Sequence, residues 1–331
     1  MNGSHTAPNP SRTLWVGVGC AAGVLLIWTS FILIARVSAK GHLSPFDISF
    51  VRFVFSGLLV LPLVIVRRDW LLKQLAPDPR VALRRGAALA VTAGVAYCCF
   101  AYSGFFFAPV SHAVVLLPGS LPLYAAIFAA LLLGERFQRA RLIGLLAIVA
   151  GNLLVAGTSL LQAIGGGNSW KGDLLFVAAA LCWASYSVLC RRWRLDAVPA
   201  TCAIAIGCLV SYVPLFALGA ATGLVPTRLS TAPWSEIAFQ AVYQGGFSML
   251  IAGIAFTQVV KTFGPVRTTM ITALVPVLAT ILAWPLLGEA MTPIGGIGLM
   301  CVTLGLLIGV RGQAVAKRDA VKPDVAGVSR R

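Results

Sequence analysis

The sequence has few charged residues and very few acidic ones. Only 11% of its 331 residues are charged, and Asp and Glu together number 10, whereas a soluble domain has about 25% charged residues. Hydrophobic residues make up 59% of the chain, and its mean hydropathy is +0.90. This shortage of charge excludes an ordinary soluble domain and predicts a membrane protein that crosses the bilayer several times.

The residue patterns of metal sites and hydrolytic enzymes are also missing. The chain has three histidines and eight cysteines, with no Cys-x-x-Cys pair, no His-Glu-x-x-His helix and no nucleotide-binding glycine loop. The cysteines fall in hydrophobic segments or at their ends, where they serve as small apolar side chains. We therefore expect no cofactor, no metal and no catalytic residue, and an intramembrane enzyme is disfavoured.

Ten apolar segments are long enough to cross about 30 Å of hydrocarbon as helices. The predicted fold is accordingly an all-α membrane protein with ten transmembrane helices. The gaps between the third and fourth, eighth and ninth, and ninth and tenth segments are short, so the exact ends of those segments are not defined by the sequence. The segments are 14–36, 46–66, 86–107, 110–134, 141–161, 172–192, 200–222, 236–259, 266–288 and 292–310.

The basic residues are distributed unequally between the two ends of these segments. If the N-terminus is cytoplasmic, 21 of the 26 Lys and Arg residues fall in cytoplasmic stretches, four fall in outer stretches, and Arg52 lies within a segment. This asymmetry is the positive-inside pattern of membrane proteins. It explains the net charge of +16 without nucleic acid, which we do not expect as a partner, and it places both termini in the cytoplasm.

Two long stretches of the chain repeat one another. Pro109–Glu135 and Pro265–Glu289 both begin with Pro-Val, carry a proline mid-helix and end in Leu-Leu-Gly-Glu. The repeat continues outside these stretches with an offset of 154 or 155 residues. The matched pairs are Pro122 and Pro276, Gly134 and Gly288, Glu135 and Glu289, Trp28 and Trp183, Gly144 and Gly298, and Gly151 and Gly305.

The duplication predicts two units of opposite orientation. Each unit has five helices, and an odd number of crossings starts the second unit on the other side of the membrane. The charges agree, because the loop after Glu135 has three arginines and the loop after Glu289 has none. We predict units at 14–161 and 172–311, a connecting loop at 162–171, and disordered tails at 1–13 and 312–331.

These features resemble the drug/metabolite transporter superfamily, EamA type. The resemblance rests on the two five-helix repeats, an aromatic residue in the first helix of each, and Pro followed by Leu-Gly-Glu closing the fourth, and it covers about 14–310. It implies a multi-pass carrier of the bacterial inner membrane with a cavity between the repeats. Its implied partners are a small metabolite and the lipid bilayer, with the chain acting as a monomer or weak homodimer.

Two basic side chains within the apolar segments are candidate charge partners for a substrate. Arg52 lies about two turns into the second segment, and His112 begins the fourth. An ionisable group in the membrane is costly and often functional. The competing interpretations are a structural arginine or one that snorkels toward the outer surface, and a hydrogen-bonded histidine at a helix entry.

Polar and aromatic residues inside the segments are candidate substrate contacts. Gln240, Gln244 and Ser248 recur every four residues beside Tyr243, and Thr272 belongs to a similar stripe in the ninth segment. Stripes of this kind face either a cavity or another helix, and we expect the glutamines to face the cavity. The aromatic candidates for a cavity wall, with interfacial anchoring as their alternative, are Trp28, Tyr97, Tyr102, Trp183 and Tyr186.

The repeated prolines and glutamates have structural interpretations. Prolines in the fourth and ninth segments, Pro122 and Pro276 among them, free carbonyl groups and permit bending. Glu135 and Glu289 end their helices, where the helix dipole does not favour a carboxylate. We expect both glutamates to bind backbone or basic groups in the turn that follows, with proton binding as the alternative.

The predicted function is secondary transport of a small metabolite, an amino acid or related compound. The predicted direction is efflux. An importer or facilitator of a vitamin-like or nucleoside-like metabolite is the alternative. A channel or a lipid-handling scaffold is less favoured, because the sequence has neither a filter motif nor rings of like residues.

Overall fold

The computed structural model describes residues 10–135 and 139–321, and every regular element in these ranges is a helix. The elements are α1 (Pro10–Ser38), α2 (Pro45–Val66), α3 (Arg68–Leu75), α4 (Pro79–Leu89), the π-helix η1 (Ala90–Val95), α5 (Ala96–Phe107), α6 (Val110–Leu116), α7 (Leu121–Leu133), α8 (Arg139–Ile164), α9 (Ser169–Trp193), α10 (Ala197–Ala221), α11 (Trp234–Gln240), the π-helix η2 (Ala241–Ile251), α12 (Ala252–Thr272), α13 (Leu274–Leu287) and α14 (Pro293–Val321).

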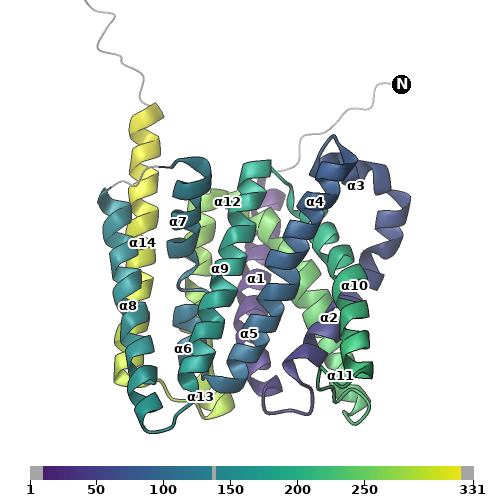
Figure 1. Ribbon diagram of the computed structural model, residues 1–331. Helices are drawn as coiled ribbons and strands as arrows, with labels where there is room; N and C mark the ends of the chain where they lie inside the picture. Colours follow the sequence, from purple (N-terminus) through teal and green to yellow (C-terminus); the bar gives the residue numbers. More distant parts are fainter. Residues whose placement is uncertain (1–9, 136–138, 322–331) are drawn as a thin grey trace, which may run out of the picture.

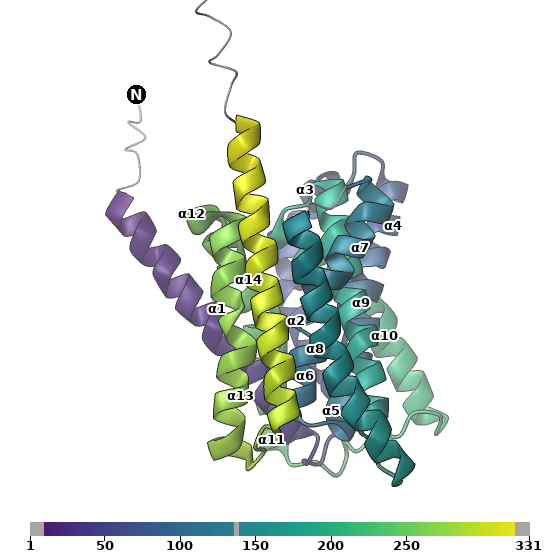
Figure 2. The same cartoon turned by 90° about the vertical axis from the view of Figure 1, so that its left-hand side faces the viewer.

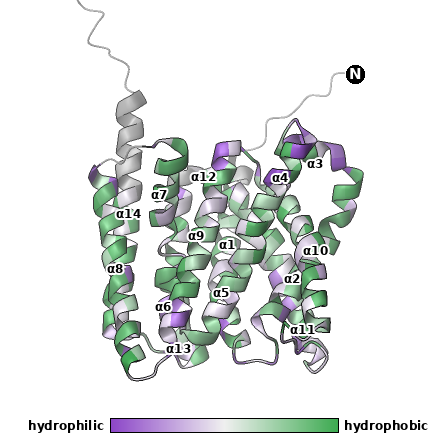
Figure 3. Cartoon of the chain, viewed as in Figure 1, coloured by the Kyte–Doolittle hydropathy of each residue, from purple (hydrophilic) through white to green (hydrophobic). Residues whose placement is uncertain are grey.

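The helices form a bundle of membrane-crossing length (Figure 1). Among the described residues, nine spans are long and apolar enough to cross a membrane, and Pro293–Gly309 is a shorter apolar helix. Apolar residues run along these helices, while α3 is among the hydrophilic parts (Figure 3). The ten predicted segments correspond to these ten helical stretches.

Some boundaries differ from the prediction for identifiable reasons. The third span begins at Pro79, not residue 86, because Pro79 occupies the first helical turn and the Asp78 side chain accepts a hydrogen bond from the backbone N–H of Arg80. The eighth span runs to Gly264, whose φ of 78° interrupts the helical backbone between the eighth and ninth spans.

Helix also reaches into the segments predicted to be disordered tails. α1 begins at Pro10 and α14 continues to Val321, so residues 10–13 and 312–321 are helical, contrary to that prediction. The remaining tail residues, 1–9 and 322–331, lie outside the described residues. α3 was not predicted either, since its eight residues are too polar and too few to span a bilayer.

The bundle has two distinct ends. Pro10 of α1 and Val321 of α14 lie at the same end, uppermost in Figures 1 and 2, which we call the upper end. α7 finishes at this upper end, whereas α13 finishes at the other, or lower, end. Glu135 and Glu289, two residues beyond α7 and α13, therefore lie at opposite ends of the molecule, as an inverted repeat requires.

α8 and α14, the fifth helices of the two repeats, pack together antiparallel through glycines. Gly144 lies against Gly305, and Gly151 against Gly298. A Cβ added at any of these four positions would lie 3.0 Å or less from a backbone oxygen of the opposite helix. Small residues permit this approach, and close packing drives helix association where both helices are already in hydrocarbon.

Irregular helix geometry occurs at equivalent places in both repeats. The third span of the first repeat contains η1, and the third span of the second repeat contains η2. If 154 is added to the residue numbers of η1, they fall within η2. The fourth spans are interrupted as well. Leu117, with φ −95° and ψ −81°, separates α6 from α7, and Ala273 separates α12 from α13. Discontinuous helices of this kind are found where a transporter binds its substrate.

The glycine contacts give a test of the packing. We expect Gly151→Leu to destabilise the protein by about 1–3 kcal/mol or more, because the larger side chain forces α8 away from α14. Gly157→Leu is the matched control, since nothing lies within 4 Å of a Cβ at this position of the same helix. The measurement is thermal unfolding in detergent. Equal unfolding temperatures for the two variants would contradict the packing described here.

Candidate functional site

A cavity of about 450 Å³ lies between the two repeats. Its deepest polar residue is Arg52 on α2, and its wall reaches Arg141 and Arg191, near the upper ends of α8 and α9. Side chains from both repeats line it. The cavity therefore extends from the middle of the bundle to the upper end, with a volume suited to a small metabolite.

Two pairs of aromatic rings line the cavity. Trp28 of α1 stacks on Phe256 of α12 with ring centroids 5.2 Å apart, and Trp183 of α9 packs on Tyr97 of α5 at 4.9 Å. Each pair joins the first helix of one repeat to the third span of the other. The structure thus places the predicted aromatic residues Trp28, Tyr97 and Trp183 in the cavity wall.

Arg52 lies deep in the bundle. Its side chain is only 5% exposed, and its Nη1 donates hydrogen bonds to the hydroxyls of Tyr102 at 3.0 Å and Ser248 at 3.5 Å. Of the interpretations left open for Arg52, snorkelling to the outer surface does not hold, because inward-facing hydroxyls bind part of the guanidinium. Its Nε is buried without a partner.

The two glutamines lie between helices and not in the cavity wall, contrary to our expectation. Gln240 donates a hydrogen bond to Ser38 of α1 at 2.6 Å, and Gln244 accepts one from Tyr102 at 2.9 Å. They are 2% and 0% exposed. Both amides form hydrogen bonds to neighbouring helices, whereas Ser248, four residues beyond Gln244, lines the cavity.

The other polar candidates divide between cavity and helix contacts. Ser248 and Thr272 line the cavity. Tyr243 is outside its described lining and donates a hydrogen bond to the Ile27 carbonyl at 3.0 Å, with the Ser30 hydroxyl 2.5 Å from its own. Tyr243 therefore joins η2 to α1.

His112 makes a buried contact between three helices near the lower end. Its Nδ1 lies 2.8 Å from an oxygen of Asp173 and 3.2 Å from the hydroxyl of Ser159. Sequence analysis missed Asp173, which begins α9 and is 5% exposed. His112 is outside the described cavity lining, and it ties α6 to α8 and α9.

The repeated Leu-Leu-Gly-Glu motif forms the same helix end twice. Gly134 and Gly288 adopt left-handed φ values of 69° and 68°, a conformation that glycine adopts without steric cost. The next backbone N–H, of Glu135 or Glu289, donates to a carbonyl six residues earlier at 3.3 Å. This left-handed glycine turn ends the helix and fixes where each glutamate lies.

The two glutamates form equivalent salt bridges at opposite ends. At the lower end, Glu289 accepts a bond of 2.6 Å from Nε of Arg36 and another of 3.0 Å from the backbone N–H of Val110. At the upper end, Glu135 binds Arg191 and, at 3.4 Å, Arg141. Arg36 and Arg191 are 155 residues apart, so each bridge links the first helix of one repeat to the fourth of the other.

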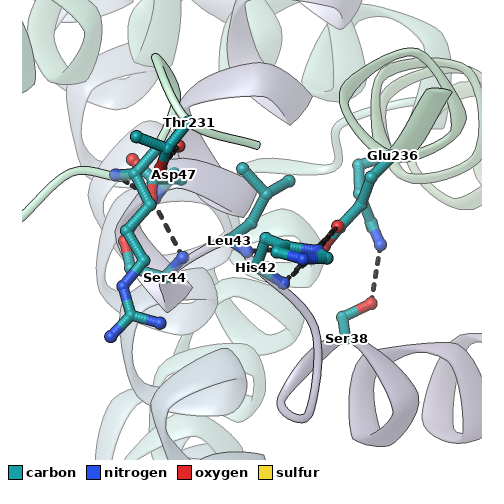
Figure 4. A network of polar contacts seen from close by, with 9 residues as sticks. Ser38, His42, Leu43, Ser44, Asp47, Thr231 and Glu236 are labelled. Carbon is teal, nitrogen blue, oxygen red and sulfur yellow. Dashed lines mark hydrogen bonds and ion pairs between the residues drawn. The ribbon is translucent and has the colours of Figure 1, made fainter. Parts of the chain in front are cut away.

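The lower end is further held by polar contacts between loops (Figure 4). The Glu236 carboxylate lies 2.9 Å from Nδ1 of His42 and accepts a bond from the His42 backbone. The Asp47 carboxylate accepts bonds from Ser44, Thr227 and the backbone of Arg228, at 2.7 to 3.0 Å. These contacts join the α1–α2 loop and the start of α2 to the segments around α11.

Several residues of this site were missed by sequence analysis. Arg36, Arg141 and Arg191 look like topology-determining charges at helix ends, and Phe256 looks like a residue facing lipid. The spacing of 155 residues between Arg36 and Arg191, the same as between Trp28 and Trp183, was the available signal.

Comparison with known proteins agrees with the repeated architecture. The family model described as the EamA-like transporter family matches residues 15–157 and 170–311. The uncharacterized transporter YyaM of Bacillus subtilis is 28% identical over 234 residues, covering 68% of this chain and 73% of its own. The uncharacterized inner membrane transporter YedA of Escherichia coli K12 is 24% identical over 315 residues, covering 94% of both chains.

A crystal structure shows the same fold. It superposes with a TM-score of 0.56 and 23% sequence identity, covering 93% of this chain and 98% of the other. The family match covers most of the chain and falls once on each five-helix repeat. The chain is a multi-pass membrane protein that belongs to the EamA-like transporter family, so it is a transporter and not an enzyme.

Proposed function

We propose that this protein is a secondary transporter of the bacterial inner membrane that exports a small metabolite by alternating access between its two inverted repeats. One observation carries the proposal: a cavity between the repeats reaches one end of the bundle, while salt bridges and loop contacts join the helices at the other. A carrier must close one end while the other is open, and inverted repeats supply two equivalent closures.

The distribution of charge supports a cytoplasmic upper end. Arginines and lysines are concentrated in the stretches that lie at this end, among them Arg141 and Arg191 at the cavity mouth. The positive-inside rule places such stretches in the cytoplasm. The cavity then faces the cytoplasm, which is the state in which an exporter loads its substrate.

The two glutamate–arginine bridges are suited to act as alternating closures. The Arg36–Glu289 side chains are 17% and 15% exposed, whereas those of Arg191 and Glu135 are 52% and 31% exposed. The first bridge is packed inside a closed end, and the second lies at the open mouth. In the opposite conformation we expect the Arg191–Glu135 bridge to be buried and the Arg36–Glu289 bridge to be opened.

Transport is tested by comparing metabolites released from cells. Cells that express the wild-type protein should accumulate at least one metabolite in the medium faster than cells without it, and Trp183→Ala should abolish most of this release by removing a cavity wall. Trp284→Ala is the control, because Trp284 is 69% exposed on the outside of the bundle. Identical media from all four strains would contradict export, and faster depletion of a medium component would indicate import.

The orientation is tested with reporters of membrane topology. A cytoplasm-active reporter fused after Glu135 should be active, and the same reporter fused after Glu289 should be inactive. A periplasm-active reporter should give the reverse pattern. The same result at both positions would contradict the inverted ten-helix arrangement.

The lower bridge is tested by exchanging its charges. Arg36→Glu and Glu289→Arg should each reduce transport strongly, because each leaves two like charges facing one another at a partly buried site. The double variant should recover a substantial part of the activity, since it restores an opposite pair. Expression and unfolding temperature are measured in parallel. A double variant no more active than the single variants, despite normal folding, would contradict the role of this bridge.

A further inference from the structure

The cavity contains a buried positive charge that no carboxylate neutralises. Among the described residues, arginines at both ends of the bundle have glutamate partners, Arg36 with Glu289 and Arg191 with Glu135. Arg52 has only the hydroxyls of Tyr102 and Ser248. A buried charge without an opposite charge is costly in the middle of a membrane, so a bound anion would relieve that cost.

Arg52 is a cavity residue whose guanidinium is only partly hydrogen-bonded. Arg52 lines the cavity and is 5% exposed, and its buried Nε–H has no acceptor. A guanidinium offers donors in a plane that matches a carboxylate. The two hydroxyls hold the Nη1 side of the group, which leaves donor capacity for a ligand.

The remaining lining makes the cavity electropositive and apolar. Its described residues include Arg141 and Arg191 but no Asp, Glu, Lys or His. α7, a helix of 13 residues, begins at the cavity wall with Leu121 and Pro122. The positive end of its dipole is thus at mid-depth, where it favours an anion. The stacked aromatic pairs supply flat apolar surfaces for the rest of a ligand.

We propose that this cavity selects an organic monoanion: a carboxylate that binds Arg52, carried on an aromatic or otherwise apolar body that lies between Trp28–Phe256 and Tyr97–Trp183. The proposal rests on the transport function argued above and specifies its substrate class. An amine of the same shape is excluded by the charge of the cavity, and a neutral amide loses the ionic part of the contact.

Such a substrate accounts for export without a coupling carboxylate. Arg52 stays on its helix, so a carboxylate that crosses the membrane carries one net negative charge outward. A membrane potential that is negative inside favours this movement by about 2.3 kcal/mol for each 100 mV. The direction of transport then follows from the charge of the substrate.

The test uses three matched probes and protein in lipid nanodiscs. The probes are 3-phenylpropanoate, its neutral amide and 3-phenylpropylamine, which differ in charge while keeping the aromatic body. Thermal unfolding is titrated with each probe for the wild type, Arg52→Gln, Arg52→Lys and Arg84→Gln. Arg84→Gln is the charge-matched control, because Arg84 is exposed and outside the described cavity lining.

Stabilisation should be specific to the carboxylate. Arg52→Gln should weaken its apparent affinity by at least about tenfold, as loss of a charged hydrogen bond predicts, while Arg84→Gln should leave it unchanged. Arg52→Lys should retain part of the affinity, and it distinguishes loss of the site from misfolding if the glutamine variant is unstable. Equal stabilisation by the amine or amide, equal affinity in Arg52→Gln, or no stabilisation by the carboxylate would overturn the proposal.

A transport measurement separates this proposal from the transport function itself. Labelled 3-phenylpropanoate is loaded into proteoliposomes, and its release is followed with a potassium-ionophore potential of either sign. Release should be faster when the loaded side is negative. Carboxylate binding through Arg52 without any release would contradict transport but leave the binding site intact. Release that is the same for both signs would overturn outward movement of net charge.

Discussion

Each repeat has an odd number of membrane crossings, and this constraint shapes the whole molecule. It turns the second repeat upside down, so each contact between the repeats has an equivalent contact at the opposite depth. The antiparallel glycines of α8 and α14 follow this relation residue by residue, and the two aromatic pairs follow it in the helices that they join. The Arg36–Glu289 and Arg191–Glu135 bridges follow it too. One set of interactions therefore supplies the scaffold, the cavity walls and a salt bridge at each end.

The chemistry of the cavity departs from this symmetry. At an offset of 154 or 155 residues the position equivalent to Arg52 is Ile206 or Gly207, and neither carries charge. Tyr102, which binds Arg52, is equivalent to Phe256, which has no hydroxyl. The two repeats thus contribute alike to movement but differently to recognition. An asymmetric ligand with one charged end requires such a difference, because a symmetric cavity would offer two equal sites for one carboxylate.

The sequence predicted the scaffold well because hydrophobic length, loop charge and repeat offset are each visible in one dimension. Side-chain direction was predicted less well. Helical spacing placed Gln240 and Gln244 on one face, but it could not distinguish a cavity from a neighbouring helix, because their partners Ser38 and Tyr102 are distant in the sequence. The partners of Arg52 were not predicted, because Tyr102 and Ser248 lie 50 and 196 residues away in the sequence. Arg36 was overlooked because a charge at a helix end has an ordinary explanation in topology.

The two salt bridges also affect the free energy that the proposed conformational change would require. A buried salt bridge is costly to break without compensation, since each separated charge loses its partner. In the proposed alternating mechanism, the loss at one end would be offset by deeper burial of the equivalent bridge at the other, which would reduce the difference in electrostatic energy between the two closed states. Substrate binding of a few kcal/mol is then enough to shift the balance between them. A single, unduplicated bridge of the same strength would hold the carrier in one state.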